Sequence, residues 1–177
     1  MNINIRKENA EEKELVYNLI KEAFKGETRS NGGEQDLVNR LRHSNSYIPQ
    51  LSLVALDGEK IVGHIMFTKI SIENQDDKVE GLALAPLAVL PEYQKKGIGS
   101  NLIKEGLKIS KELGYKSVVV LGSEQYYPKF GFKEAIDFGV KPPFEVPSKN
   151  FMVIELEENS LKNVEGIVVY AKEFFEI

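Results

Sequence analysis

Apolar and polar residues along the first half of the chain follow two spacings. Near the N-terminus they alternate, which is typical of a strand. Apolar residues then recur at helical spacing and fall on one face of a helix. Asn9, with Glu12 three positions later, marks the start of that helix, and Gly26 marks its end. The patterns predict a strand over 3–5, helices over 9–26 and 34–42, and strands over 51–56 and 61–72, the last two joined at the hairpin signal Asp57-Gly58.

The second half begins with two strongly apolar runs that a polar turn and a helix separate. The run over 80–90 is apolar at both parities, as expected for a strand covered on both faces. Pro86 removes one backbone donor and predicts an irregular or bulged strand at that point. The turn covers 91–99, the helix 100–113 and the second strand 117–121. A strand, turn, helix and strand in this order predict a βαβ crossover with parallel strands.

Beyond this unit the elements become short. The patterns predict a short helix over 124–130, a strand from Phe132, an ordered proline-containing loop over 136–150, and strands over 151–156 and 167–170. The length of 177 residues and the apolar fraction of 42% predict a single domain over 1–177 with a sizeable core.

Composition and charge remove several classes of function. The chain has no Cys, which excludes disulfides, thiolate zinc sites and a Cys nucleophile, and its two His residues make a His-rich metal site unexpected. The net charge is −4 with both signs interspersed, so nucleic acid is not an expected partner. The N-terminus lacks the apolar core of a signal peptide, and no run is long enough to cross a membrane. We therefore expect a cytoplasmic protein that binds no metal and no membrane.

The turn before the second helix has the features of a phosphate site. Free N–H groups at a helix N-terminus, together with the helix dipole, favour an anion. Gly97 and Gly99 remove the Cβ atoms that would obstruct it, and two lysines add positive charge. Two nucleotide motifs fail here, because no lysine follows Gly99 as in a P-loop and Leu102 stands where a dinucleotide fingerprint needs its third glycine. A nucleotide-binding protein stays a third hypothesis.

Two motifs in order make the chain similar to a known family. Gln94-Lys95-Lys96-Gly97-Ile98-Gly99 resembles the Q-x-x-G-x-G turn of the GNAT (N-acetyltransferase) superfamily, and the stretch from Tyr126 to Phe132 resembles its second mark. The segment 34–42 and the tail 166–170 are similar to the YhbS-like branch. The resemblance implies an α/β fold with a mixed, mostly antiparallel sheet of six to seven strands, one splayed parallel pair, and about four flanking helices.

The resemblance also implies a cofactor and a reaction. It implies transfer of an acetyl group from acetyl-coenzyme A to a primary amine of a small molecule or peptide, with no metal. The pantetheine arm would lie along the end of the first parallel strand, and the pyrophosphate would lie in the turn. The residues expected to bind the cofactor are Leu87, Ala88, Val89, Gln94, Lys95, Lys96, Gly97, Ile98, Gly99 and Ser100.

The chemistry needs an acid, an oxyanion donor and a route for the amine proton. Tyr127, four residues before Gly131, matches the family's acid and would protonate the leaving thiolate. The backbone N–H of Val89 is the expected oxyanion donor. Residues 81–90 contain no acid, so Glu80 is the expected base, with Glu124 and deprotonation through water as open alternatives. Attack is expected to be direct, since no Cys can carry the acyl group.

Other interpretations remain open at this point. Tyr126 is expected to pack, and His64 to be a structural histidine with its bonds satisfied. The main alternative function is a non-catalytic acyl-coenzyme A-binding module, such as a sensor. The loops 26–36 and 136–150 are expected to shape the acceptor site. A monomer or a homodimer is expected.

Overall fold

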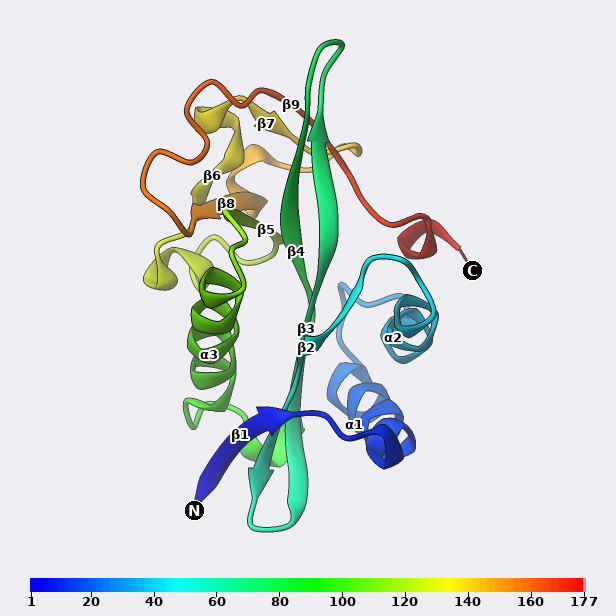
Figure 1. Cartoon of the computed structure of the whole chain (residues 1–177). Helices are drawn as coiled ribbons and strands as arrows, with labels where there is room; N and C mark the ends of the chain where they lie inside the picture. Colours follow the sequence, from blue (N-terminus) through cyan, green and yellow to red (C-terminus); the bar gives the residue numbers. More distant parts are fainter. Residues whose placement is uncertain (177) are drawn as a thin grey trace.

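A computed structural model describes residues 1–176. One sheet separates α3 from α1 and α2, and the C-terminal segment ends beside α2 (Figure 1). The helices are α1 (Lys13–Phe24), α2 (Glu34–Arg42) and α3 (Ile98–Glu112). The strands are β1 (Ile3–Lys7), β2 (Tyr47–Asp57), β3 (Lys60–Glu73), β4 (Lys78–Val89), β5 (Ser117–Leu121), β6 (Lys133–Glu134), β7 (Val140–Lys141), β8 (Phe151–Glu155) and β9 (Gly166–Val169).

The strand order confirms the predicted mixed sheet. The main path runs β1-β2-β3-β4-β5-β8-β6, and β9 pairs with β3 and β7. Most pairs are antiparallel, while β4 and β5 are parallel and are joined through α3, as the crossover prediction required. The sheet has nine strands rather than the predicted six to seven, because it includes the two-residue strands β6 and β7. The described chain has three α-helices, because the predicted helix over 124–130 is only a 3-10 turn, η3 (Tyr127–Phe130), with a proline at its start.

β4 is irregular beside Pro86, as predicted. Its pairing with β3 jumps from Ile65–Leu87 to Phe67–Leu84, which leaves one extra residue on β4 and makes a bulge. The bulge lies midway along a strand whose flanking residues pair regularly. It therefore changes the direction of the strand's exposed amides at one defined place.

β4 and β5 pair over a short distance only. The register contains Leu82–Val118 and Ala83–Val119, while β4 continues to Val89 and β5 to Leu121. The carboxyl ends of the two strands therefore splay apart. This opening lies beside the bulge at Pro86 and next to the glycine turn at the N-terminus of α3. The two features that the sequence indicated therefore meet at the opening.

The helix α3 lies very close to the sheet because of two glycines. A Cβ on Gly106 would overlap the Phe67 ring, and one on Gly63 would lie 3.0 Å from Leu102 Cδ1. Bulkier residues would push the helix outward and widen the space above β4. The close contact holds the start of α3 over the opening.

A buried polar cluster ties β1 to the sheet and to α2. The Glu8 carboxylate accepts a bond from the Arg42 guanidinium and one from Ser52 Oγ at 2.6 Å. Ser52 Oγ also lies 3.0 Å from His64 Nε2, and His64 is fully buried. Burial lowers the pKa of His64, so the ring is neutral near pH 7. Burial alone would raise the pKa of Glu8, but the nearby His64 ring, the bond from Ser52 and the Arg42 charge lower it overall. His64 is structural, although its Nδ1 has no partner among the described residues.

Candidate functional site

The glycine turn is exposed and open. Gly97 has φ +84° and no atom within 4 Å of a Cβ position, and Lys95 also adopts a left-handed conformation at φ +62°. Alternating left- and right-handed residues turn successive N–H groups to one side, which makes a concave anion site. Gln94, Lys95 and Lys96 are exposed, so the turn is not sealed inside the protein.

The amides that follow the turn are free to bind a ligand. The first helical bond of α3 runs from Asn101 N–H to the Gly97 carbonyl, so the N–H groups of residues 98–100 have no partner of this kind. The first turn of α3 contains no acid that would oppose an anion. Ile98 is predicted to bind through its backbone, and its side chain is buried in the core, which fixes the start of the helix.

Two amides of β4 face the opening between the parallel strands. Leu90 N–H donates to the Val62 carbonyl of β3 at 2.9 Å, so alternate residues of β4 bond to β3. Leu87 and Val89 have the opposite parity, and their N–H groups point away from β3. Gln94 Nε2 donates to the Val89 carbonyl at 3.1 Å, which joins the turn to the strand end. Ala88 points to the other face and is buried.

Tyr126 closes one side of this opening. Its hydroxyl lies 3.0 Å from a Cβ position at Gly99, and the same position lies 3.7 Å from Leu87 Cδ2 and 3.8 Å from Val89 Cγ2. The strand, the turn and η3 therefore meet around Gly99. The sequence indicated only packing for Tyr126, because spacing does not show where a ring in a short turn ends.

Tyr127 lies directly behind Tyr126. Their rings are 5.2 Å apart in a T-shaped arrangement, and the Tyr127 ring contacts Gly122, just after β5, so closely that a Cβ there would overlap it. Burial, with a smaller effect of Tyr126, raises the pKa of Tyr127 well above its usual value. The Tyr127 hydroxyl is therefore protonated across the physiological range, as an acid requires.

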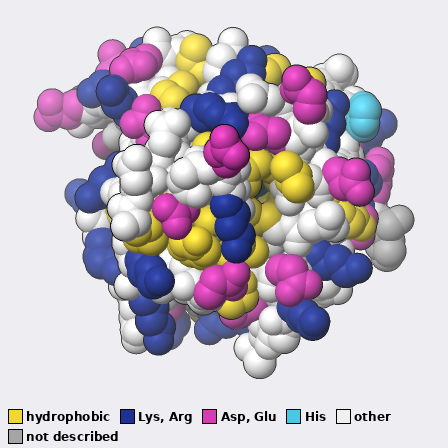
Figure 2. All heavy atoms as spheres, turned by 90° about the horizontal axis from the view of Figure 1, so that it is seen from below, with side chains coloured by type: hydrophobic (Ala, Val, Ile, Leu, Met, Phe, Trp, Pro, Cys, Tyr) yellow, Lys and Arg dark blue, Asp and Glu magenta, His cyan; other side chains and the backbone are white. Residues whose placement is uncertain are grey.

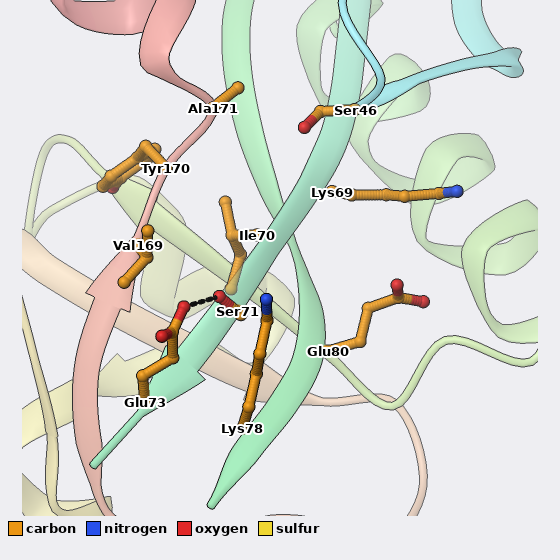
Figure 3. A pocket seen from close by; sticks show the side chains of 10 residues that line it. All are labelled: Ser46, Lys69, Ile70, Ser71, Glu73, Lys78, Glu80, Val169, Tyr170 and Ala171. Atoms are coloured by element: carbon orange, nitrogen blue, oxygen red, sulfur yellow. Dashed lines mark hydrogen bonds between the residues drawn. The ribbon is translucent and has the colours of Figure 1, made fainter. Parts of the chain in front are cut away.

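The structure does not bring Glu80 to the glycine turn. Glu80 is exposed and lines a cavity of about 470 Å³ with Ser71 and Tyr170, where its side chain points away from Ser71 (Figure 3). Seven residues of strand separate it from Leu87, which corresponds to roughly 20 Å. Any proton transfer from the opening to Glu80 would have to pass through water.

Glu124 is bound to its own loop. Its carboxylate accepts a bond from Asn150 Nδ2 at 2.7 Å and pairs with Lys149 Nζ at 3.4 Å. A backbone hydrogen bond, the Asn150 bond and the Lys149 charge lower its pKa, which makes it a weaker base. We infer that Glu124 holds the segment after β5 to the loop before β8.

A second opening lies on the opposite face of the splayed strands. This apolar pocket, about 250 Å³ in volume, is bounded by Leu84 and Ala85 at the bulge of β4, by Leu121 at the end of β5 and by Leu37 of α2. Its remaining lining residues are aromatic: Phe144, Tyr170, Phe174 and Phe175. The bulge is thus reached from two sides, from the glycine turn and from α2.

Neither the charges on the face shown in Figure 2 nor the metal-binding side chains of the described residues indicate a further site. On the face seen from below, Lys and Arg side chains alternate with Asp and Glu around a central group of hydrophobic side chains (Figure 2). Residues 1–176 contain no group of three His, Cys, Asp or Glu residues placed to hold a metal ion. Among the described residues no helix combines the length and apolar character needed to cross a membrane.

Comparison with known proteins agrees with this geometry. The family model described as "Acetyltransferase (GNAT) domain" matches residues 4–135. This chain therefore belongs to the GNAT N-acetyltransferase superfamily. Within it the chain falls in the YhbS-like branch, as the following relatives show.

The relatives include bacterial proteins of similar length. "Uncharacterized N-acetyltransferase YhbS" of Escherichia coli (strain K12) is 31% identical over 88% of this chain and 89% of its own. "Uncharacterized N-acetyltransferase YjhQ" of the same strain is 42% identical over 70% of each chain. The crystal structure of E. coli YhbS in complex with CoA has a TM-score of 0.89 and 29% identity, covering 100% of this chain and 94% of that one. A GNAT family acetyltransferase from Brucella melitensis in complex with acetyl-CoA has a TM-score of 0.80 and 29% identity over 98% of both chains.

Proposed function

We propose that the protein transfers an acetyl group from acetyl-coenzyme A directly to a primary amine of a small molecule or peptide. The observation that carries the proposal is the exposed turn 94–99, whose unobstructed amides stand over the splayed ends of β4 and β5. The crystal structures of YhbS with CoA and of the Brucella protein with acetyl-CoA support the choice of cofactor.

The residues of the opening fit such a cofactor. The N–H groups of residues 95–100 would hold the pyrophosphate, aided by the dipole of α3. The Leu87 N–H, which faces the opening, would bond the pantetheine arm as a neighbouring strand would, which leaves the Val89 N–H for the acetyl carbonyl. Filling the cradle at Gly99 with a Cβ would crowd Tyr126, Leu87 and Val89 together. The cofactor supplies an activated acetyl thioester.

Two groups then act on the transferring acetyl group. The Val89 N–H donates to the carbonyl oxygen as negative charge develops on it. Tyr127 donates its proton to the departing sulfur, and its raised pKa keeps that proton in place until then. The amine nitrogen forms the new bond to the carbonyl carbon as the carbon–sulfur bond breaks.

The amine must also lose a proton. Glu80 is the only acid within β4 (Lys78–Val89), and its distance from Leu87 requires a chain of water molecules. Deprotonation by water alone fits the same geometry. A Glu80→Gln variant decides between them, since a base would shift the acid limb of the pH–rate profile and a bystander would not.

Turnover and binding measurements test the proposal. Thermal unfolding with coenzyme A, acetyl-coenzyme A, ATP and NAD should show stabilisation by the first two only. Thiol release from acetyl-coenzyme A should depend on an added amine and should fall sharply in Tyr127→Phe. Tyr126→Phe is the matched comparison: its hydroxyl lies beside Gly99, so the loss should appear in the KM for acetyl-coenzyme A rather than in kcat.

Each outcome has a distinct meaning. Failure of coenzyme A to bind at millimolar concentration would overturn the proposal entirely. Tight binding without transfer to any amine would favour the non-catalytic binding module. Equal kcat values for Tyr127→Phe and the wild type would show that Tyr127 is not the acid.

A further inference from the structure

The apolar pocket opens at the place where an acceptor has to arrive. Leu84 and Ala85 belong to the bulge of β4, and Leu121 ends β5, so the pocket ends in the splay. The glycine turn and Tyr126 approach the splay along the α3 face, whereas α2 and the C-terminal segment enclose the pocket on the other face (Figure 1). A molecule in the pocket would meet an acetyl group held along β4 from the opposite side.

Aromatic side chains from two distant segments form one wall of the pocket. Phe144 stacks on Tyr170 with ring centres 5.9 Å apart, and the ring centre of Phe174 lies 5.0 Å from that of Tyr170. Phe175 completes the wall at 6.2 Å from Tyr170. Phe175 is 60% exposed and Leu121 is 47% exposed. Apolar side chains left open to water in a hollow are typical of a ligand contact.

Charge is confined to the outside of the pocket. None of the described residues that line it is charged, and its one polar side-chain group is the Tyr170 hydroxyl. Leu37 and Phe174 also line an outer cavity of about 920 Å³, whose charged lining residues are Arg29, Glu34, Asp36, Arg40 and Glu176. The path from the surface to the bulge therefore changes from polar to apolar.

Resting on the acetyltransferase function proposed above, we propose that the acceptor is a small primary amine with one compact aromatic or alkyl body, held in the apolar pocket with its nitrogen toward Ala85. A dry cavity of about 150 Å³ lined by Leu, Ile and Phe holds a benzene ring. The 250 Å³ here therefore accommodate a ring with a short aminoalkyl chain.

Other amines fit this pocket poorly. A polyamine or an aminoglycoside held in this pocket would place additional ammonium groups against Leu121 and the aromatic wall, and the described residues that line the pocket include no carboxylate. The carboxylates of Glu34, Asp36 and Glu176 line the outer cavity instead. A peptide would bring backbone amides, for which the Tyr170 hydroxyl is the one polar side-chain partner among the described lining residues. A neutral primary amine has the least polar surface to lose.

Equilibrium binding and turnover with a small amine panel test the inference. The probes are 2-phenylethylamine, hexylamine, spermidine and a lysine-containing peptide, each measured on coenzyme A-loaded protein and in thiol release. We expect the two apolar amines to exceed spermidine by roughly 10-fold or more in kcat/KM, since 10- to 200-fold is the usual effect of a hydrophobic contact. Phe144→Ala should raise the KM for 2-phenylethylamine about 10-fold with a smaller effect on kcat, while Leu15→Ala, an exposed residue of α1, should leave both unchanged.

The results separate the two proposals. If coenzyme A does not bind, the proposed function itself fails. If coenzyme A binds but spermidine or the peptide is bound or acetylated in preference, or if no apolar amine binds at millimolar concentration, the acceptor class is wrong while the cofactor site stands. A second copy of the chain could also cover the aromatic wall, and sedimentation tests this. If Phe175→Ser dissociates a dimer and leaves amine binding unchanged, the wall is an interface between two copies and the inference is overturned.

Discussion

Replacing Gly99 by alanine should weaken cofactor binding without harming the fold. Gly99 is the second residue of α3, and its φ lies outside the left-handed region, so alanine adopts the same backbone without strain. Alanine is the better helix former by about 1 kcal/mol in a helix interior. The added methyl would lie 3.0 Å from the Tyr126 hydroxyl, which ends a side chain that can shift. We therefore expect unchanged or slightly higher thermal stability.

In the proposed complex, the same methyl group would stand between the pyrophosphate and the helix amides. Loss of one hydrogen bond to a charged group costs about 1.5–3 kcal/mol, which corresponds to a Kd for coenzyme A raised roughly 10- to 150-fold. Isothermal titration calorimetry measures this directly. The control is Lys104→Ala, an exposed position on the same helix, with an expected Kd near that of the wild type. A Gly99→Ala protein that binds coenzyme A as the wild type does would refute the assignment of the turn.

Three further predictions concern proton transfer and the buried polar cluster. Tyr127→Phe should lower kcat by about 100-fold or more. Because burial raises the pKa of Tyr127 above its usual 10, the wild-type kcat should not fall through deprotonation of this acid up to about pH 10. A fall in kcat near neutral pH that is absent in Tyr127→Phe would contradict this assignment. The pKa of His64 is lowered in the folded protein, so below pH 6.5 the unfolded state binds one proton more than the folded state. The free energy of unfolding should therefore fall as the pH falls, by at most about 1.4 kcal/mol per pH unit. Urea unfolding measured at about pH 7 and 5.5 should show a smaller difference in this free energy for His64→Gln than for the wild type. Arg42→Ala leaves the buried Glu8 carboxylate without its guanidinium and should cost about 3–5 kcal/mol in urea unfolding, while Glu8→Leu with Arg42→Met should cost clearly less; equal losses would show that the charge is not the cause.

The sequence predicts the strand, turn and helix around the proposed cofactor site well, because their signals are local. A fully apolar strand, a turn with two glycines and an amphipathic helix each leave a pattern within a few residues of one another. Pro86 marks the bulge for a similarly local reason, since it cannot donate to the ladder. The two-residue strands β6 and β7 are too short to show any period, and the turn at Pro128 resembles a helix start.

The acceptor side depends on contacts that no local pattern records. Leu37, Phe144 and Phe174 belong to three segments that only the folded sheet brings together. Tyr126 is in a similar position, since its contact with Gly99 joins the turn before α3 to the turn after β5. The sequence did predict that the loops 26–36 and 136–150 shape the acceptor site. The structure places Asn31 and Phe144 of these loops along the two connected cavities.

The absence of an acid from residues 81–90 and the apolar wall around the bulge have one physical explanation. An alkylammonium has a pKa near 10 in water, and an apolar site lowers that pKa because it disfavours the charged form. Lowering it to about 7 requires roughly 4 kcal/mol of differential desolvation. Burial of an aromatic or alkyl body stabilises the bound amine by about 1.5–3 kcal/mol, which offsets much of that cost. An amine without such a body gains no offset, so the surface that we propose selects the acceptor would also favour its reactive, neutral form, and a carboxylate among residues 81–90 would work against both effects.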